Sequence, residues 1–321
     1  MPPSWDSSIA DELQMVEQEI RTNVRSQQDL LTEISMHVIG SGGKRIRPGV
    51  TLLSHYACGG SDTRRVIGVA AAFEIIHSAT LIHDDINDGG ETRRGVVTAY
   101  RKYGVQRALI AGDFLFVRGF RLGGFLDQEL VDIIADACTG MAESEILQGQ
   151  YELDPEIPVD VYLRIIEGKT AKPIEAGART GAALAGASPE RIEALGHYGL
   201  NLGIAFQIVD DVLDVTGEEK VLGKHRGMDF LDGKPTLPLI LAASNGGPGG
   251  RIRELFIKPD KTGDEVDEVM GYLSDPEVLA RSREHAFRFK ERAVDSLKAL
   301  PDSAYKEGLI RLADLVVSRD F

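Results

Sequence analysis

The amino-acid sequence predicts an all-α protein. Apolar residues recur at the three- and four-residue spacing of helix faces through most of the 321 residues. Alanine, leucine, isoleucine and glutamate are frequent, whereas tryptophan occurs once and the alternating pattern of strands is scarce. A length of 321 residues allows two domains, but single large helical domains of this size also exist, so length alone leaves both arrangements open.

The N-terminal half contains the pattern of several helices. Ser7 or Ser8 suits the cap of the first, and Pro48 suits the first turn of a helix that follows a glycine-rich loop. Residues 62–88 have an almost wholly apolar middle, which predicts a long buried helix. The other expected helices of this half span residues 8–37, 104–120 and 128–150.

The C-terminal half alternates helices with irregular segments. One helix opens at Pro158, and Gly168 with Pro173 predicts a kink in it, because glycine weakens a helix and proline lacks an N–H donor. Residues 188–214 are expected to form a second long apolar helix. The remaining expected elements are a functional lid over residues 217–238, a hinge or surface loop over residues 245–250, and amphipathic helices from residue 252 onward.

Composition and charge limit the class of protein. A formal net charge of −14 argues against nucleic acid as a partner, and it means that an anionic substrate must be attracted by a local cation cluster or a metal. Cys58 and Cys138 have no metal-ligand spacing, which indicates buried free thiols in a reducing cytoplasm. The acidic, polar first residues are unlike a signal peptide, and no apolar run reaches the roughly 18 residues of a membrane span. We therefore expect a cytoplasmic protein without a membrane span.

The first chemical motif, DDINDGGETRRG, begins at Asp84. Asp84 and Asp88 point to one face of a helix, and His77 shares that face two turns earlier. Carboxylates this close repel by roughly 1–3 kcal/mol per pair at an effective dielectric near 20, so a cation is expected above them, and an all-oxygen ligand set suits Mg²⁺. Arg93 and Arg94 supply planar donors for phosphate oxygens. The motif predicts a diphosphate clamp, against the alternative of a solvated acidic helix end and a basic loop.

A second aspartate motif, DDVLD, begins at Asp210, again at the end of a long apolar segment. Nothing in a soluble helix requires a second triple carboxylate with the same spacing, so the pair strongly favours a functional interpretation. Gln207 lies one turn before it and continues the same stripe. Two such faces opposed across a cavity could hold several Mg²⁺ ions on one diphosphate.

Basic residues elsewhere are candidate anion ligands. The segment GGKRIRP places Lys44 and Arg47 in a loop whose glycines let the backbone approach an anion, although a solvated loop is the alternative. The expected kink could aim Lys169 and Thr170 into a pocket, the alternative being a surface lysine at a helix break. The candidate phosphate ligands of the lid are Lys224 and Lys234.

Taken in order, these motifs resemble the head-to-tail trans-prenyltransferases, the polyprenyl (isoprenyl) diphosphate synthases, over nearly the whole chain. The resemblance is carried by GGKRIRP, two DDxxD motifs, RRG after the first, a central KT, a glutamine before the second motif, and the ordered series GK, GMD and GKPTLP. The family implies one domain over residues 1–321, an all-α bundle of the isoprenoid synthase type with a deep central cavity, and a homodimer.

The resemblance also implies the reaction and the residues that serve it. Isopentenyl diphosphate would attack the cation left when an allylic diphosphate ionises, and the departing diphosphate would accept the proton. About three Mg²⁺ ions per active site would bridge that diphosphate, and the product would leave through transient membrane contact. The implied metal ligands are Asp84, Asp85, Asp88, Asp210, Asp211 and Asp214. The implied allylic-diphosphate ligands are Arg93, Lys169, Thr170, Gln207, Lys224 and Lys234, of which Arg93 and Lys169 also count as catalytic. The implied isopentenyl-diphosphate ligands are Lys44, Arg47, His77 and Arg94.

Product length depends on the side chains beneath the first motif. The family associates an aromatic residue at the position of Ala79 with short products, and Thr80 lies one turn before the motif. Without a plug there, the tunnel could extend past Ile76 and Ala72. Each helical turn of about 5.4 Å would admit roughly one more five-carbon unit. We predict a product longer than C20. A floor closed by Phe114 or Phe116 would instead give geranylgeranyl or farnesyl diphosphate.

Two other classes compete with this interpretation. A class I terpene cyclase shares the first aspartate motif, but its second motif mixes Asn, Ser or Thr with Glu, unlike Asp210 to Asp214. A catalytically silent partner subunit tends to lose one motif, and both are intact here.

Overall fold

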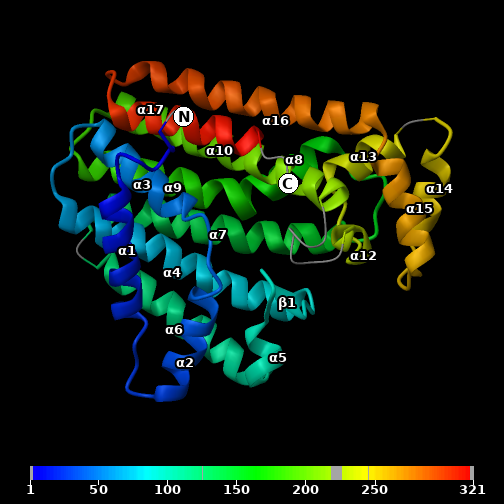
Figure 1. The fold of residues 1–321 in the computed structure, drawn as a ribbon, viewed down its shortest axis with the longest axis horizontal. Coiled ribbons are helices and arrows are strands. Elements are labelled where there is room, and N and C mark those ends of the chain that lie inside the picture. The colour runs from blue at the N-terminus through cyan, green and yellow to red at the C-terminus, as the bar shows by residue number, and fades with distance from the viewer. Residues whose placement is uncertain (1–2, 125, 218–225, 245, 319–321) are drawn as a thin grey trace. The chain divides into compact units, whose positions relative to one another are not determined.

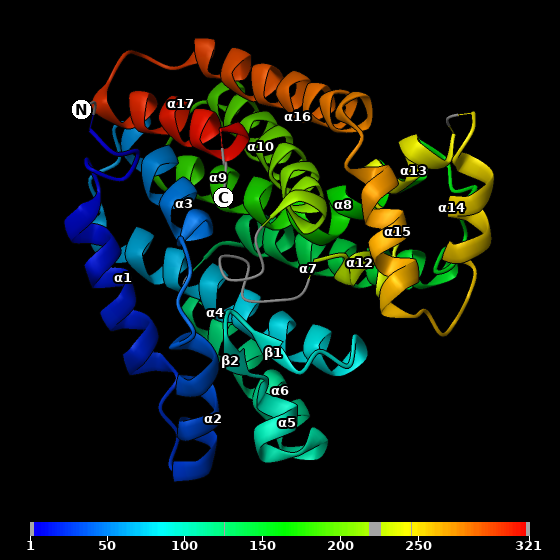
Figure 2. The same ribbon diagram turned by 45° about the vertical axis from the view of Figure 1, so that its right-hand side comes forward.

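The computed structural model describes residues 3–124, 126–217, 226–244 and 246–318 (Figures 1 and 2), and these residues are overwhelmingly helical. The prediction of an all-α fold is confirmed. By packing, the chain forms two compact units, while the prediction of one domain over residues 1–321 stays a prediction. The first unit comprises Met1–Ala135, Glu175–Gly196 and Leu297–Arg311, and the second comprises Asp136–Ile174, His197–Ser296 and Leu312–Phe321.

Helix α4 (Thr63–Asn87) is the core of the first unit, as the apolar segment of residues 62–88 predicts. The side chain of Asp62 caps it by accepting a hydrogen bond of 3.1 Å from the Arg65 N–H. Among the described residues, α4 is the one helix long and apolar enough to cross a membrane, yet 83% of that apolar window is buried inside the protein, as in a core helix. It packs against α1 (Ala10–Asn23), α3 (Ile46–Ala57) and α6 (Val105–Leu122), as Figure 2 shows.

The prediction of a single helix over residues 8–37 is wrong, because two helices occupy this range. Helix α1 ends at Asn23 and α2 (Asp29–Ile39) follows. Between them, the Ser26 N–H donates to the Thr32 hydroxyl at 2.8 Å, so a side chain takes the place of a helical carbonyl. The serine cap is also wrong: the cap residue is Ile9, which provides no side-chain hydrogen bond.

A small hairpin follows α4, and the sequence pattern did not predict it. Strand β1 (Thr92–Arg93) pairs antiparallel with β2 (Val96–Val97) through a two-residue loop, Arg94-Gly95. Both loop residues have positive φ, 53° and 75°, as a type I′ turn requires, which explains the glycine. The hairpin leads into α5 (Ala99–Tyr103) and is tied to α2, since His37 Nε2 lies 2.7 Å from the Val97 carbonyl oxygen.

A π-helical turn lies where the sequence predicts a kink. Helix α8 (Val159–Ile166) continues through π-helical residues Glu167–Ala171 into α9 (Lys172–Leu184). A Cβ added at Gly168 would lie 1.8 Å from Ser144 Oγ of α7 (Gln128–Gln150), so glycine permits the close contact of these helices. Such wide turns inside α-helices are frequent at functional sites.

The rest of the second unit surrounds α13 (Leu237–Ala243), which is wholly buried and packs against α8 and the helices that follow it. The described part of the predicted lid contains α12 (Met228–Leu231) and the start of α13, and Lys224 lies outside the described residues. The remaining elements are α10 (Pro189–Thr216), α14 (Gly249–Phe256), α15 (Gly263–Leu273), α16 (Pro276–Ser296), the short 3₁₀ turn Leu297–Ala299 and α17 (Ala304–Val317). The helices predicted from residue 252 onward are therefore present.

Candidate active site

The first aspartate motif lies at the C-terminal end of α4. Asp88 is the helix cap, and its N–H donates to the Asp84 carbonyl oxygen at 2.8 Å, so these two residues are one turn apart as predicted. Their side chains are partly exposed, whereas Asp85 between them is buried. The motif therefore presents its outer carboxylates to solvent and turns its middle carboxylate inward.

The buried Asp85 carboxylate is paired with Arg93 of the hairpin. Arg93 Nε donates to Asp85 Oδ1 at 2.7 Å, which joins β1 to the end of α4. Burial raises the pKa of Asp85 above its ordinary value; Arg93 opposes that rise, and the charge of Asp88 adds to it. The contact fixes the plane of the guanidinium beside the motif, as bidentate binding of a phosphate requires.

His77 lies about two turns before Asp84 on α4, at a concentration of positive charge. Loss of hydration lowers the pKa of His77 well below its ordinary value, so the ring is neutral near pH 7. The positive charges of four arginines lower the pKa of His77 further. They are Arg47, Arg94, Arg93 and Arg45. Four guanidinium groups that act on one ring in an otherwise acidic protein indicate a local anion site.

Residues 42–47, the basic loop, lie against the hairpin. Arg94 Nη1 donates a hydrogen bond to the Gly42 carbonyl oxygen. A Cβ at Gly43 would lie 2.9 Å from Arg94 Nη1, so glycine allows this close approach. Lys44 is exposed in the loop and Arg47 is partly exposed in the first turn of α3. The first unit thus brings together the predicted ligands His77, Arg47, Arg93 and Arg94.

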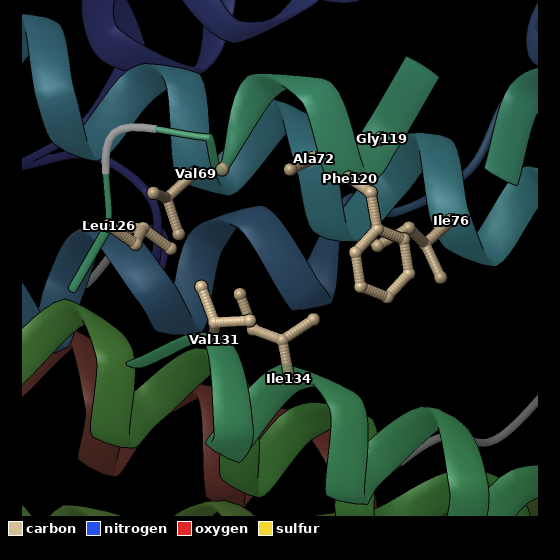
Figure 3. A pocket seen from close by; sticks show the side chains of 9 residues that line it. Val69, Ala72, Ile76, Gly119, Phe120, Leu126, Val131 and Ile134 are labelled. Atoms are coloured by element: carbon tan, nitrogen blue, oxygen red, sulfur yellow. The ribbon is translucent and has the colours of Figure 1, made fainter. Parts of the chain in front are cut away.

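An apolar pocket lies further down α4 (Figure 3). Its wall on α4 is formed by Val69, Ala72 and Ile76, which are spaced along one face of the helix. Every lining residue is apolar, and the empty space is about 320 Å³ including open solvent at its mouth. The other lining residues are Gly119, Phe120, Gly123, Leu126, Val131 and Ile134.

Some of the residues that the sequence analysis connects with product length line this pocket, and others do not. Ile76 and Ala72, the predicted continuation of the tunnel, both line it, whereas Phe114 and Phe116 are not among its lining residues. Ala79 is fully buried, and the Thr80 hydroxyl donates to the His77 carbonyl oxygen at 2.9 Å. A small side chain at position 79 therefore adds no bulk between the motif and the pocket.

The second aspartate motif lies in the last turns of α10, where hydrogen bonds surround its middle residue. Tyr162 OH donates to Asp211 Oδ2 at 2.6 Å, and Gln207 Nε2 donates to Asp211 Oδ1 at 2.9 Å. The Thr170 hydroxyl in turn donates to Gln207 Oε1 at 2.8 Å. Burial raises the pKa of Asp211 well above its ordinary value, and the charge of Asp229 adds to the rise. Three helical segments thus converge on one carboxylate.

The other predicted residues of the second unit also have defined partners. Lys169 in the π-helical turn forms an ion pair of 2.5 Å with Glu145 and a hydrogen bond of 2.9 Å to Gln148. Asp214 is buried, and its Oδ2 accepts from the Asp229 N–H at 3.2 Å. Lys234 Nζ lies 3.4 Å from Asp232. Asp210 is partly exposed one residue before Asp211.

Each unit therefore assembles one acidic motif together with its own cations or amides. The prediction that the two acidic faces oppose each other stays a prediction. Sequence reasoning missed Tyr162 and Glu74 as partners of site residues. Glu74 carried a signal, since it is a charged residue in an almost wholly apolar stretch, whereas Tyr162 carried none short of the tertiary fold.

Comparison with known proteins decides the family. A family model described as polyprenyl synthetase matches residues 28–273. The chain belongs to the polyprenyl synthetase family. An all-trans-nonaprenyl-diphosphate synthase (geranyl-diphosphate specific) of Rhodobacter capsulatus is 37% identical over 97% of this chain and 96% of its own. An octaprenyl diphosphate synthase of Haemophilus influenzae is 37% identical over 98% of this chain and 96% of its own.

The family also includes relatives named for a shorter product and solved structures. A geranylgeranyl diphosphate synthase of Methanosarcina mazei is 36% identical over 91% of this chain and 90% of its own, so identity alone does not separate product lengths. The crystal structure of a Caulobacter crescentus polyprenyl synthase, complexed with calcium and isoprenyl diphosphate, superposes with a TM-score of 0.94 at 34% identity and covers 98% of this chain and 97% of that one. As a polyprenyl synthetase, the chain is an enzyme of the trans-prenyltransferase class, with the helical fold of the isoprenoid synthases.

Proposed function

We propose that the chain condenses isopentenyl diphosphate with an allylic diphosphate and releases a trans-polyprenyl diphosphate longer than C20. The observation that carries this proposal is the sequence of features along α4: outer carboxylates at its end, arginines around His77 beneath them, and a wholly apolar pocket below. Such an order suits a substrate with a diphosphate head and a hydrocarbon tail. Family membership and the long-chain names of two relatives support it.

The proposed metal is Mg²⁺, and the side chains of each motif fit it. All the candidate ligands are carboxylates, and Asp84 and Asp88 present theirs one turn apart. Within the described ranges, no three Asp, Glu, His or Cys side chains converge on a point that could hold a metal ion. Mg²⁺ often takes only one or two protein carboxylates, and water and phosphate oxygens supply its other ligands. The solved Caulobacter relative was obtained with calcium, another hard cation.

When bound, Mg²⁺ supplies positive charge that stabilises the diphosphate leaving group. The chain's own residues have separate tasks. Arg93, fixed by Asp85, donates to the phosphate oxygens on which negative charge grows. The neutral ring of His77, together with Lys44 and Arg47 of the basic loop, binds the diphosphate of isopentenyl diphosphate. In the second unit, Lys169 and Thr170 lie next to Glu145 and Gln207 and are assigned to the allylic diphosphate.

The apolar pocket is assigned to the growing product. Because its lining has no polar side chain, a hydrocarbon tail there gains roughly 0.8 kcal/mol for each CH₂ that leaves water. An apolar wall also keeps water from the allylic cation, which water would quench. The pocket lies two turns or more below Asp84 along α4, which favours a product longer than C20 over geranylgeranyl diphosphate.

We further propose that the enzyme is a cytoplasmic homodimer that touches membranes only when product leaves. Helix α6 exposes four apolar side chains on one face, a surface that a second copy of the chain would cover. Asp113 interrupts this face and lies 3.6 Å from His83 Nε2. Cys58 and Cys138 are free thiols whose pKa values are raised by burial, that of Cys138 to about 11, as suits a reducing compartment. The four exposed apolar residues of α6 are Val105, Leu109, Ile110 and Val117.

One assay tests the proposed function. The purified full-length chain is incubated with Mg²⁺, labelled isopentenyl diphosphate and, in separate reactions, dimethylallyl, geranyl or farnesyl diphosphate, and the dephosphorylated products are sized by chromatography. Linear products longer than C20 are expected. Cyclic hydrocarbon formed without isopentenyl diphosphate would identify a terpene cyclase. No incorporation from any primer would identify a catalytically silent subunit.

A further inference from the structure

Among the three cations of the basic loop, Arg45 has a side chain that turns inward to two carboxylates. Its side chain is only 14% exposed, whereas Lys44 just before it is exposed. The neighbouring cations are assigned to the diphosphate of isopentenyl diphosphate under the proposed function. Arg45 therefore needs a different explanation.

Two acidic residues from two different helices bind the Arg45 guanidinium. Nε pairs with Glu17 Oε1 of α1, and Nη1 pairs with Glu74 Oε1 of α4 at 2.5 Å. Nη2 lies 3.4 Å from the Ile39 carbonyl oxygen at the end of α2. All three nitrogens of the guanidinium are thus directed to protein partners. Arg45 joins α1, α2 and α4 beneath the basic loop.

The backbone at Arg45 is also unusual. Its φ of 51° and ψ of 38° lie in the left-handed region, which non-glycine residues rarely adopt. Its carbonyl oxygen accepts the Gly49 N–H at 2.9 Å and so begins α3. Among the described residues, just two other non-glycine residues have positive φ, and one is Arg94, which bonds to this same loop. Such strain persists where surrounding contacts hold it, and it is common at binding sites.

The ion pairs of Arg45 lie next to the candidate diphosphate site. Glu74 is 5% exposed and lies one turn before His77 on α4, so both are on one face. A Cβ at Gly43 would lie 3.5 Å from Arg45 Nη1 and 2.9 Å from Arg94 Nη1, which places the loop backbone between these two arginines. Moving the Arg45 side chain would therefore move the loop against His77.

We propose that Arg45 is a positioning residue: its ion pairs with Glu17 and Glu74 fix the basic loop in the conformation that binds the diphosphate of isopentenyl diphosphate. This inference rests on the proposed function. It differs from a ligand role, because the guanidinium is directed to Glu17 and Glu74 and not to the substrate. It also differs from a purely structural role, because it predicts weaker binding of isopentenyl diphosphate and unchanged binding of the allylic primer.

The test compares Glu74→Gln, Arg45→Gln and the double variant in the full-length enzyme. Binding of isopentenyl diphosphate is measured by calorimetry without a primer, and KM is measured for both substrates. We expect each single variant to raise Kd and KM for isopentenyl diphosphate about tenfold and to leave KM for the allylic primer within about twofold. The double variant should be no worse than the poorer single variant, since both remove one interaction.

The sign of the Glu74→Gln effect separates the explanations. If Arg45 were a substrate ligand, freeing it from Glu74 would leave isopentenyl diphosphate binding unchanged or tighter. If the ion pairs only stabilised the fold, the melting temperature would fall while Kd stayed the same. Either result overturns the proposal. Glu33→Gln, which alters an exposed carboxylate that accepts a hydrogen bond from Tyr103, is the matched control and should change neither Kd nor KM.

Milder variants keep the test valid if Glu74→Gln does not fold. Glu17 is 31% exposed, so Glu17→Gln is better tolerated and should weaken isopentenyl diphosphate binding in the same direction by a smaller factor. Arg45→Lys keeps the charge but cannot reach both carboxylates in the same way, and should fall between wild type and Arg45→Gln. A wild-type enzyme that bound no isopentenyl diphosphate would contradict the proposed function. A wild type that binds it, with variants that bind it equally well, would contradict this inference alone.

Discussion

The hydroxyl of Tyr162 donates a hydrogen bond of 2.6 Å to Oδ2 of Asp211, and the two side chains are only 3% and 4% exposed. The first motif has a parallel contact, since Asp85 accepts a hydrogen bond from Arg93. In both motifs, then, the second aspartate is buried and held by a donor from another element, while the first is partly exposed. The proposed role of each second aspartate is to orient the helix end that carries the candidate metal-binding carboxylates.

Tyr162→Phe tests this relationship in the second motif. Removing the hydroxyl leaves a buried carboxylate with one donor fewer, so we expect a loss of about 1–3 kcal/mol in the free energy of unfolding. Chemical denaturation measures this loss, and a Mg²⁺ titration of activity should show weaker apparent metal binding. Tyr272→Phe is the matched control, because its hydroxyl donates to Glu268 at 3.2 Å at a partly exposed position and should contribute under about 1 kcal/mol. Equal losses in the two variants would contradict the role given to Tyr162.

Arg93→Gln tests the first motif. Arg93 fixes Asp85 and is assigned to the charge that grows on the leaving diphosphate, so its loss should lower kcat by about 10²–10³-fold. Arg101→Gln provides the control, because the ion pair of Arg101 with Glu91 is exposed on both sides and contributes little. Steady-state kinetics with saturating substrates compares them. An Arg93→Gln enzyme with wild-type kcat would remove Arg93 from the catalytic groups.

The long helices could be predicted because local signals and burial agree there. Residues 128–150 match α7 in full, and residues 62–88 enclose α4 with its Asp62 cap. The break after Asn23 could not be predicted, because apolar spacing continues to Val24 and the Thr32 contact that competes with the helix depends on the folded chain. The hairpin could not be predicted either, because strands of two residues on each side of Arg94-Gly95 are too short to show an alternating pattern.

For the site, the sequence predicts which residues gather and not what holds them. Spacing places Asp84 and Asp88 one turn apart, and the structure has them so. The inward direction of Arg45 was not predictable, because the sequence does not distinguish three cations within four residues. Its partners Glu17 and Glu74 lie on other helices and meet it only in the folded chain. The π-helical turn at Lys169 likewise depends on the close packing of Gly168 on Ser144.

The face of α6 gives a prediction about assembly. Replacing Leu109 and Val117 together by lysine places charge on the exposed apolar face without disturbing the buried side of the helix. We expect a dimer for the wild type and a monomer for this double variant in analytical ultracentrifugation at micromolar concentration. A double lysine substitution at Met15 and Leu30, exposed apolar residues of α1 and α2, should leave the mass unchanged. A monomeric wild type would contradict the proposed interface.

His55 predicts how stability depends on pH. Its ring is fully buried, Nδ1 lies 3.2 Å from the Gly181 carbonyl oxygen, and burial lowers its pKa below the ordinary value near 6.5. Below pH 6.5 the unfolded chain binds a proton that the folded chain does not, so the free energy of unfolding should fall as the pH falls. Urea denaturation from pH 8 to pH 5 measures this slope, and His55→Gln should make it shallower. The lowered pKa of His77 contributes in the same direction, so His77→Gln is measured alongside. If neither variant changed the slope, the pH dependence would not come from these two histidines.

The pocket on α4 predicts how product length can be changed in both directions. Phe120→Ala removes a ring from the pocket wall and should lengthen the main product by about one five-carbon unit, since one helical turn is about 5.4 Å. Ala72→Phe fills the pocket from its α4 wall and should shorten the product by one unit or more. Phe114→Ala removes an equal ring that does not line the pocket, so its products should match the wild type. Chromatographic sizing decides. A change with Phe114→Ala and none with Phe120→Ala would place the end of the product chain elsewhere, because only a residue in contact with the terminal isoprene unit can limit its growth.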